Sequence, residues 1–547
     1  MTGDGGGGRR VGPAAWFASA CVVVGGLWFG RALSLPFLGD DLHEVHRASL
    51  GPSAGEWFSA GDGVVFLRPV FRASLWLDHA LHGTDPTGYH LTNVALHVVA
   101  SLLVACFAAE LVRSLPLAGP LRGRGAAALP FLAGGLFLVL PSHGEPVYWI
   151  SGRADLLATC WSLASLVGYL RSRRTGSPLA FAASLAAFAL ALLSKESAVA
   201  LPAVVWLFSF AEAPTPAERG SSALWAAARR TAPHLAVLAG YLGTRWVLLG
   251  TPVGGYDVTA QADPGPLRLA AQYVVTVGRS ILPSAPRTVW FLVLGGVLVT
   301  APVVARAVRT GRPGPAAARR AIALPLALAG AVLVTTLPVA GIGAAAHGPA
   351  GERVVYLPSA FAATLVAVGL AWCARRPAVL AVACAAIVAV AAPVGVREAN
   401  RWTDAGRAAS AVLDPLVARP PDSVVHLVNA PDSVRGAVAF RNAAAGVDPL
   451  LRGEDAGSVR VVTGVALDDP EQPFDVQLER APGRADLLVR PVDGAPILRS
   501  DYADDLGWGV TELGHGAYRV EVPPSVPQSS VRVFDGGELR TPADTHD

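Results

Sequence analysis

Long apolar windows recur over residues 13–403, and they constrain the fold of this chain more than any other feature. A helix needs about 20 consecutive apolar residues to cross the hydrocarbon core of a bilayer. Windows of that length predict a mainly α-helical membrane bundle of about eleven transmembrane helices, with small residues at the helix contacts. The predicted spans centre near Val22, Leu102, Leu136, Ser162, Ala186, Val204, Ala239, Leu294, Leu328, Val366 and Ile387.

The composition agrees with a membrane location for most of the chain. Of its 547 residues, 52% are hydrophobic and only 16% are charged, and the mean hydropathy is +0.45. A soluble globular protein of this size carries more charge and less apolar surface. This composition therefore argues against a soluble protein.

The arginines predict the orientation of the bundle. With eleven spans, every arginine cluster falls on the same side of the membrane, and the positive-inside rule places that side, with the N-terminus, in the cytoplasm. The segments 34–88, 141–155 and everything after about Arg397 then lie at the outer face. The clusters are Arg9/Arg10, Arg113/Arg122/Arg124, Arg171/Arg173/Arg174, Arg229/Arg230, Arg306 to Arg320 and Arg375/Arg376.

Three parts are expected along the chain: a disordered cytoplasmic head at 1–12, the membrane domain at 13–403, and a small β-rich domain outside the membrane at 404–547. The last part is polar, and short β-type runs alternate in it with turn residues. The five cysteines all fall inside predicted spans and lack metal-type spacing, so no disulfide framework is expected. The β-type runs are 423–428, 459–467, 474–479, 485–490, 518–522 and 531–535.

The first outer loop, 34–88, contains a segment with helical periodicity at 69–83. The pattern places Val70, Leu75, Leu77 and Leu81 near one face. We interpret this segment as an amphipathic helix lying on the membrane surface.

Polar residues gather at the outer ends of the predicted spans, in four clusters that would meet at one rim if the helices bundle. Lys195 is the only lysine of the chain. Any one cluster also fits the charged and aromatic belt that ordinarily marks a membrane interface. The clusters are Asp40/Asp41 with His43 and Glu44; His143, Glu145, Tyr148, Trp149, Arg153 and Asp155; Lys195 with Glu196; and His347, Glu352, Arg353 and Tyr356.

Together the clusters predict a polar cavity at the membrane surface. Two abutting carboxylates, Asp40 and Asp41, repel each other, so one of them can have a raised pKa and accept a hydroxyl proton. Lysine and arginine placed opposite would bind an anionic phosphate. A base, a phosphate site and access to lipid favour transfer from a lipid-linked phosphate donor to a hydroxyl acceptor.

Several of these segments, in this order and spacing, resemble the membrane region of the tetratricopeptide-associated O-mannosyltransferases and their bacterial relatives, which are members of the GT-C superfamily of polytopic glycosyltransferases. The similarity extends over roughly residues 15–405. The segments are LGDDLHEV, RPVFRASLWLDHALHGTDPTGYHLTNVALHVVASLL at 68–103, HGEPVYWISGRADLLA at 143–158, LLSKESAVALP and GERVVYLPS.

The resemblance implies a polyprenyl-phosphate-linked sugar donor, a mannose-type hexose being favoured, and a catalytic acidic pair in the first outer loop. By position, Asp40 and Asp41 match that pair. We take Asp40 as the base and Asp41 as the residue that orients it, although the sequence leaves the reverse assignment open. One-step displacement by the acceptor would invert the anomeric centre.

The remaining candidate residues follow from charge, side of the membrane and membership of these motifs. Lys195, Arg153 and Arg353 are candidates for binding the donor phosphate. The expected partners are the lipid-linked donor, a protein or glycan acceptor and the bilayer of a bacterial inner membrane, without nucleic acid. No cofactor is indicated, although Asp40, Asp41 and His43 leave a divalent metal ion open. Candidates for substrate binding are His143, Glu145, Glu196, Glu352 and Tyr356.

The chain also departs from the family pattern. Leu140 precedes Pro141 where the family usually has histidine, and the Glu352-Arg353 motif continues with two valines and so loses one aromatic residue. The β-type runs stand where helical repeats often follow. A transporter or flippase of a lipid-linked sugar and a non-catalytic scaffold remain alternatives, although transporters tend to place ionisable residues near the bilayer midplane.

Overall fold

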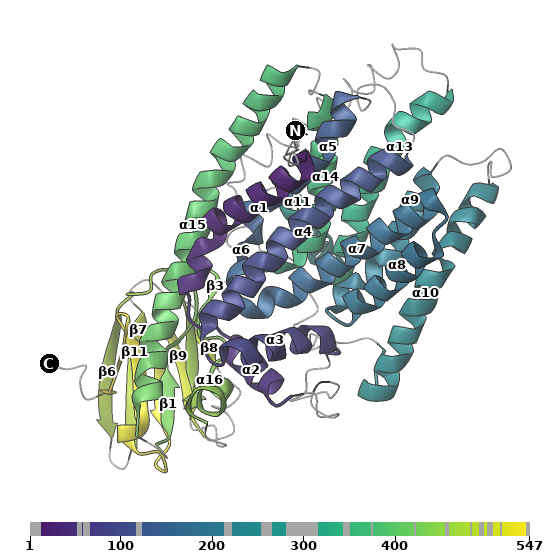
Figure 1. Ribbon diagram of the computed structural model, residues 1–547. Helices are drawn as coiled ribbons and strands as arrows, with labels where there is room; N and C mark the ends of the chain where they lie inside the picture. The colour runs from purple at the N-terminus through teal and green to yellow at the C-terminus, as the bar shows by residue number, and fades with distance from the viewer. Residues whose placement is uncertain are drawn as a thin grey trace, which may run out of the picture.

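The chain folds into a helical bundle that is joined at one end to a β-rich C-terminal part (Figure 1). The long helix α15, Pro377–Ala418, runs along one side of the bundle and leads directly into the strands. This computed structural model describes residues 12–51, 57, 66–115, 123–212, 221–252, 265–280, 315–342, 350–372, 376–420, 423–453, 459–481, 484–491, 497–499, 507–514 and 517–542.

Helices α4 and α8 begin where local sequence signals place them. Asp85 caps α4 by accepting a hydrogen bond from the backbone nitrogen of Thr87 at 3.0 Å, and Ser177 caps α8 in the same way. A proline follows each cap at the first helical position. The α-helices are α1 (Pro13–Phe29), α2 (Asp41–Ser49), α3 (Pro69–His82), α4 (Pro86–Ser114), α5 (Arg124–Leu138), α6 (Gly144–Tyr148), α7 (Arg153–Thr175) and α8 (Pro178–Leu192).

Between α8 and α15 the structure describes five further α-helices. Short 3-10 turns connect the elements at the ends of the bundle. The α-helices are α9 (Leu201–Ala211), α10 (Ser221–Leu249), α11 (Gly265–Arg279), α13 (Pro315–Thr336) and α14 (Tyr356–Trp372). The 3-10 turns of this bundle are η1 (Gly30–Ser34), η3 (Pro141–His143), η4 (Ile150–Gly152), η5 (Glu196–Ala200), η6 (Leu337–Val339) and η7 (Glu352–Val355).

Every predicted span centre except Leu294 lies on one of these helices, and Leu294 lies outside the described residues. Among the described residues, four helices are long and apolar enough to cross a membrane: Pro13–Ser34, Pro86–Ser114, Glu352–Ala371 and Pro377–Ala418. A fifth span is formed if Arg124–Leu138 and Pro141–Tyr148, bent by 58°, count as one. The chain is therefore a mainly helical membrane protein, and the count of eleven spans stays a prediction.

Helix α7 explains why hydropathy alone is a poor guide in this bundle. It lies between α4 and α8, and its polar side chains Thr159, Ser162 and Ser165 are buried against neighbouring helices. Because these side chains face neighbouring helices and not lipid, their polarity does not exclude a membrane span. Ser165, for example, lies 3.2 Å from the hydroxyl of Ser184 on α8.

Helices α2 and α3, which connect α1 to α4, lie across the end of the bundle that is nearest the strands (Figure 1). The predicted helix at 69–83 is confirmed as α3, and its position on the membrane surface stays a prediction, but its leucines do not share one face. Leu75 is buried, whereas Leu77 and Leu81 are 52% and 67% exposed. The buried face instead includes Arg72 and Asp78, because α3 packs its polar side chains against charges of the bundle.

The predicted β-rich character of the C-terminal part is confirmed, and each predicted run overlaps a strand. The strands form three four-stranded sheets, with orders β12-β11-β1-β4, β6-β7-β10-β9 and β3-β2-β5-β8. Bounds are β1 (Val425–Val428), β2 (Ala430–Val434), β3 (Ala437–Val438), β4 (Val459–Val461), β5 (Thr463–Leu467), β6 (Phe474–Ala481), β7 (Arg484–Pro491), β8 (Ile497–Arg499), β9 (Gly509–Gly514), β10 (Ala517–Val522), β11 (Val531–Asp535) and β12 (Glu538–Arg540).

The sheets differ in direction. In the first, β1 lies between two parallel neighbours, β11 and β4, while β6-β7-β10-β9 is antiparallel throughout. Alternate residues of β10 are buried, among them Tyr518 and Val520, as expected where one face of a sheet covers a core. Short helical turns also occur here: α16 (Ala444–Gly446), the π-helical η9 (Val447–Arg452) and η10 (Gln528–Ser530).

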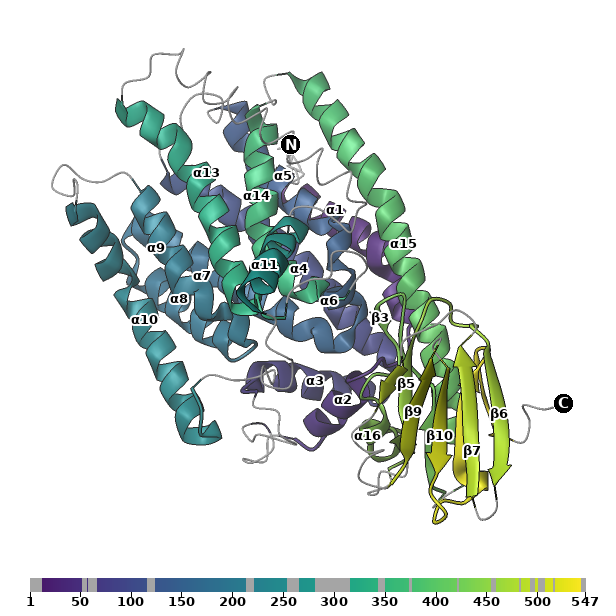
Figure 2. The same cartoon turned by 180° about the vertical axis from the view of Figure 1, so that it is seen from behind.

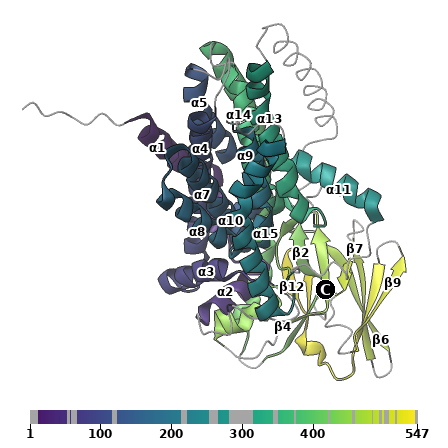
Figure 3. The ribbon, with the colours of Figure 1, turned by 90° about the vertical axis from the view of Figure 1, so that its right-hand side faces the viewer.

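The C-terminal strands pack against the second half of α15 (Figures 2 and 3). The composition changes near Asp404, but α15 continues to Ala418. Arg435 of the β-rich part donates to Asp404 of α15 at 2.9 Å, so the polar end of this helix belongs to the contact between the two parts. The predicted head at 1–12 lies, apart from Gly12, outside the described residues.

Candidate functional site

Asp41 is fully buried at the start of α2, and both of its carboxylate oxygens accept hydrogen bonds. Oδ1 accepts from the backbone nitrogen and the hydroxyl of Ser151, each at 2.7 Å, and Oδ2 accepts from the backbone nitrogen of Leu38 at 2.9 Å. Burial raises the pKa of Asp41 to about 7 against the opposing effect of these bonds. Asp41 thus ties the turn before α2 to η4.

Asp40 precedes Asp41 and is only half-buried. Its Oδ1 accepts a hydrogen bond from the side-chain amide of Asn442 at 2.8 Å. Burial also raises the pKa of Asp40, the neighbouring charge of Glu44 adds to this, and the charges of Arg353 and Arg441 oppose it. The two adjacent carboxylates therefore differ: Asp41 is enclosed by donors, and Asp40 is the one that solvent can reach.

Arg153 is completely buried at the N-terminal end of α7. Its guanidinium forms an ion pair with Asp78 of α3 at 2.6 Å and donates to the side-chain oxygen of Asn93 at 2.7 Å and to the carbonyl of Tyr89 at 2.8 Å. The Nη1 atom that pairs with Asp78 also donates to the carbonyl and hydroxyl oxygens of Ser74, each at 3.3 Å. These contacts lock α3, α4 and α7 together and leave the guanidinium inside protein.

Lys195 forms a buried ion pair with Asp155 of α7. The next residue, Glu196, accepts from Arg68 at 2.8 Å and lies 3.5 Å from Arg245 of α10. The charges of Arg353 and Arg68 also act on Asp155. Residues from the first loop, α7, η5 and α10 therefore form one charged cluster.

Arg353 connects this charged cluster to the acidic pair. It is ion-paired with Glu145, whose Oε2 also accepts from the backbone nitrogen of Arg353 at 2.8 Å, and its guanidinium lies 5.1 Å from the centre of the Trp149 ring. The side chain of Arg353 is 16% exposed, whereas those of Arg153 and Lys195 are 0% and 6% exposed. Of the three predicted phosphate ligands, Arg353 is the most accessible.

The other predicted substrate-binding residues lie deeper. Glu352 is buried in an ion pair with Arg279 of α11, and His143 and Tyr356 are fully buried in an aromatic cluster with Phe137. His143 lies 2.8 Å from the hydroxyl of Ser359, and the hydroxyl of Tyr356 lies 2.7 Å from His97. His347, from the same sequence cluster, lies outside the described residues.

The structure brings Asp40, Asp41, Glu145 and Arg353 to one end of the bundle, with the Lys195 cluster beside them. Sequence reasoning missed their partners. Asp78 and Ser151 lie inside quoted motifs and could have been suspected, whereas nothing in the local sequence of Asn442 points to Asp40. The partners missed are Arg68, Asp78, Asn93, Ser151, Asp155 as the carboxylate paired with Lys195, Arg245, Arg279 and Asn442.

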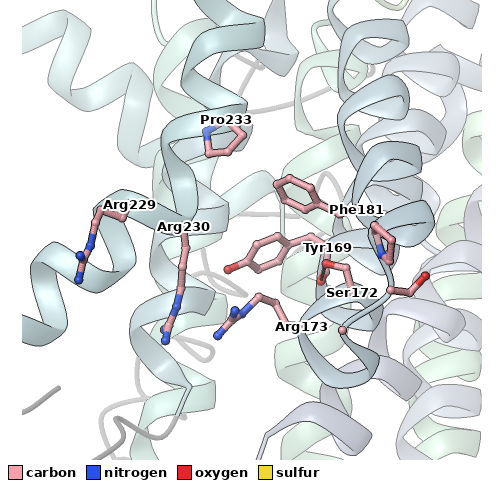
Figure 4. A pocket seen from close by; sticks show the side chains of 10 residues that line it. Tyr169, Ser172, Arg173, Phe181, Arg229, Arg230 and Pro233 are labelled. Atoms are coloured by element: carbon pink, nitrogen blue, oxygen red, sulfur yellow. Dashed lines mark hydrogen bonds between the residues drawn. The ribbon is translucent and has the colours of Figure 1, made fainter. Parts of the chain in front are cut away.

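A cavity of about 350 Å³ lies at the other end of α7, where α7, α8 and α10 meet (Figure 4). Arg173 and Arg230 point toward the same space and share Glu212 as partner, at 3.2 and 3.5 Å, while Arg229 points away. Because α7 separates it from Asp40, this basic cavity is not part of the acidic site.

Within the described ranges, no three histidine, cysteine or acidic side chains gather in a way that could hold a metal ion.

Comparison with known proteins identifies relatives but no matching family model. The chain is 34% identical over 193 residues to protein O-mannosyl-transferase Tmtc2 of Drosophila melanogaster, a match that covers 34% of this chain and 18% of that protein. Protein O-mannosyl-transferase F38B6.6 of Caenorhabditis elegans is 34% identical over 119 residues, covering 22% and 16%. Human TMTC1 is 28% identical over 184 residues, covering 31% and 20%.

Two solved structures also align with the chain: ArnT from Cupriavidus metallidurans bound to undecaprenyl phosphate, at 15% identity, and its apo state, at 14%. The alignments cover 94% and 93% of this chain and 100% and 98% of the other, with a TM-score of 0.40 in both. That score is too low to assign the fold. The sequence matches to the three O-mannosyl-transferases cover at most 20% of the length of those proteins. Over the matched residues the predicted resemblance is confirmed, because this chain is similar to protein O-mannosyl-transferases.

Proposed function

We propose that this chain is a membrane glycosyltransferase of the GT-C type. It moves a sugar, with mannose-type hexoses favoured, from a polyprenyl-phosphate-linked donor to a hydroxyl of a protein or glycan at the outer face of a bacterial inner membrane. The observation that carries the proposal is the position of Asp40. It is a half-buried carboxylate next to a fully enclosed one, at the end of a bundle whose sequence is similar to O-mannosyl-transferases.

In this proposal Asp40 is the general base. Its carboxylate takes the proton of the acceptor hydroxyl while the acceptor oxygen forms a bond to the anomeric carbon and the bond from that carbon to the phosphate oxygen breaks. The electron pair leaves with the phosphate, and the anomeric centre inverts. Asp41 holds the turn, because both of its oxygens are occupied by Leu38 and Ser151.

The leaving phosphate needs positive charge near its developing negative charge. Arg353 is the best candidate, since its planar guanidinium is partly exposed and electrostatically linked to Asp40. Lys195 and Arg68 supply further charge beside it. Arg153 acts from within the protein by fixing α3 against α7, and it does not contact the donor.

The predicted substrate-binding residues divide in the same way. Glu145 and Glu196 orient the cations Arg353 and Arg68. His143, Glu352 and Tyr356 are buried, so they shape the floor of the site and do not contact the sugar. The reaction in this scheme uses side chains of the protein and requires no cofactor.

The test is transfer of radiolabelled sugar from polyprenyl-phosphate mannose, and then glucose, to protein or lipid in membranes carrying each variant. We expect Asp40→Asn to lower transfer at least about a hundredfold, since general-base groups contribute roughly 10² to 10⁴. Asp41→Asn should lower transfer by a smaller factor, because it disturbs only the position of the turn that carries Asp40. Asp475→Asn, at an exposed ion pair on β6, is the matched control.

Three results would contradict parts of this scheme. Full transfer by both variants would remove the acidic pair from catalysis. Transfer lost in Asp41→Asn but kept in Asp40→Asn would reverse their roles. If wild-type membranes consume no donor, the enzyme proposal fails, and a flippase or a scaffold takes its place.

The proposed orientation has its own test. In a variant without its five native cysteines, Arg171→Cys and Glu538→Cys place one thiol at each end of the molecule. A membrane-impermeant maleimide should label the residue-538 thiol in cells with a permeabilised outer membrane and the residue-171 thiol only in inverted vesicles. Labelling of both from the same side would overturn the orientation.

A further inference from the structure

The C-terminal part reaches the candidate site through residues 437–446, which lie on the turn that carries Asp40. The backbone nitrogen of Gly39 donates to the carbonyl of Ala439 at 2.9 Å. Helix α16, which ends at Gly446, lies beside α2 (Figures 1 and 2). The contact joins segments that are about four hundred residues apart in sequence, and it involves main chain as well as side chains.

Two glycines make this close approach of backbones feasible. Gly39 has a φ of +51°, and a Cβ atom there would meet Val438 and lie 2.9 Å from the carbonyl oxygen of Arg441. At Gly446 a Cβ atom would meet Leu42 and lie 2.6 Å from the backbone nitrogen of His43. Real Cβ atoms do not tolerate such distances to backbone, so both positions require glycine.

Asn442 is held in an unusual conformation at the centre of this contact. Its φ is +57°, in the left-handed region that asparagine adopts more readily than most residues. In this conformation its side-chain amide donates to Oδ1 of Asp40 at 2.8 Å. The neighbouring Arg441 is fixed by Asp432, with contacts of 3.0 Å and 2.5 Å.

We propose that the C-terminal part completes the site, and that Asn442 is a positioning residue that holds the carboxylate of Asp40 in its working orientation. This inference rests on the proposed function of Asp40. The amide occupies Oδ1 and leaves Oδ2 for the proton of the acceptor. A second part of the chain, docked by close main-chain contacts, thereby sets the geometry of a base that belongs to the membrane part.

The first arm of the test measures kinetics. Asn442→Gly removes the amide and keeps the left-handed backbone, which glycine adopts without strain. We expect kcat to fall about tenfold while KM for the donor stays unchanged, since hydrogen bonds to charged groups are worth about that factor. Arg490→Ala, which removes an exposed ion pair on β7, is the matched control and should behave as wild type.

The pH profile separates positioning from a general loss of structure. The bond from Asn442 lowers the pKa of Asp40, so its removal should move the acid limb of kcat/KM to higher pH. The other charged groups facing Asp40 are Asp41 and Glu44 on α2, Arg353 on η7 and Arg441, and Asn442→Gly leaves all of them in place. An unchanged kcat and an unchanged acid limb would overturn the positioning role.

The second arm is independent of activity. In a chain without its native cysteines, Asp40→Cys and Asn442→Cys place two thiols in contact, and a protease site between α9 and α10 separates them in sequence. Oxidation should keep the cleaved fragments together on a non-reducing gel, whereas Asp40→Cys paired with Glu538→Cys should not. Loss of fragment linkage in the first pair would overturn the docking.

The two arms distinguish the two proposals. If wild type transfers no sugar but the cross-link forms, the proposed function fails and the docking of residues 437–446 on the Asp40 turn stands. If wild type transfers sugar but no cross-link forms and Asn442→Gly keeps its kcat, the inference fails and the function stands.

Discussion

The two ends of α7 use arginine in opposite ways. At the Arg153 end, two ion pairs are one-to-one and buried: Arg153 with Asp78, and Lys195 with Asp155, have side chains at most 6% exposed. Glu196, which is more exposed, is shared there by Arg68 and Arg245. At the other end, arginines share carboxylates. Glu212 serves Arg173 and Arg230, and Glu110 serves two arginines whose side chains are 36% and 58% exposed.

The difference has a physical cause. A buried charge must be matched by a partner, because leaving water costs several kcal/mol per ion and only a well-placed partner repays it. An exposed arginine needs no such partner, since water and salt screen it. Buried one-to-one pairs therefore indicate where the structure must be exact. The exposed arginines that share carboxylates lie at the end that the positive-inside rule would place in the cytoplasm.

The largest expected effect is at Arg153. Arg153→Met leaves Asp78 buried without its partner, so we expect about 3–5 kcal/mol of destabilisation, measured as a lowered midpoint of thermal unfolding in detergent. Arg174→Met, at the other end of α7, should change stability by less than about 1 kcal/mol. Equal destabilisation by Arg153→Met and Arg174→Met would show that the two ends of α7 do not differ in how strongly their ion pairs stabilise the fold. The double variant Arg153→Met/Asp78→Leu should regain part of the loss, because it removes both charges.

A smaller effect on stability, together with a loss of turnover, is expected at Arg353. Arg353→Gln should lower sugar transfer about ten- to a hundredfold, since it removes a charge-assisted contact to the leaving phosphate. Thermal stability should also fall, but less than for Arg153→Met, because the backbone nitrogen of residue 353 still donates to the buried Glu145. Transfer at the wild-type rate would show that the donor phosphate binds elsewhere. Arg173→Gln provides the control with the same chemical change at the opposite end.

Asp41 predicts a pH dependence of stability. Its pKa is about 7 in the folded chain, above its ordinary value of 3.8, so between these pH values the folded chain keeps a proton that the unfolded chain releases. The contribution of Asp41 to the free energy of unfolding should therefore fall as the pH rises from about 4 to about 7, and it should stay constant at higher pH. Asp41→Asn should flatten that part of the curve of unfolding midpoint against pH. A curve with unchanged slope would assign the dependence to other groups.

The smallest effects are expected at the basic cavity. Arg173→Gln and Arg229→Gln should change transfer less than about twofold, since surface substitutions away from buried features usually stay within about 0.5 kcal/mol. The measurement is the same transfer assay, with stability recorded alongside. A loss as large as that of Arg353→Gln would show that the two ends of α7 are coupled.

Local sequence patterns predicted a large part of this fold. Apolar windows located the helices, because a hydrophobic stretch of the right length is a property of neighbouring residues. Alternation located the strands of the C-terminal part for the same reason. Periodicity did not separate Leu75 of α3, which is buried, from the exposed Leu77 and Leu81. The buried face of this helix depends on partners in the bundle, such as Arg153 for Asp78.

The sequence by itself determined that this is a helical membrane protein with a β-rich C-terminal part, and that two acidic residues follow its first span. Tertiary structure decided which of them is enclosed, which arginine each carboxylate holds, and that Asn442 donates to Asp40. Hydropathy and periodicity depend on residues that lie close together along the chain. Ion pairs and backbone contacts between distant segments depend on how whole helices and sheets pack, and no single stretch of residues contains that information.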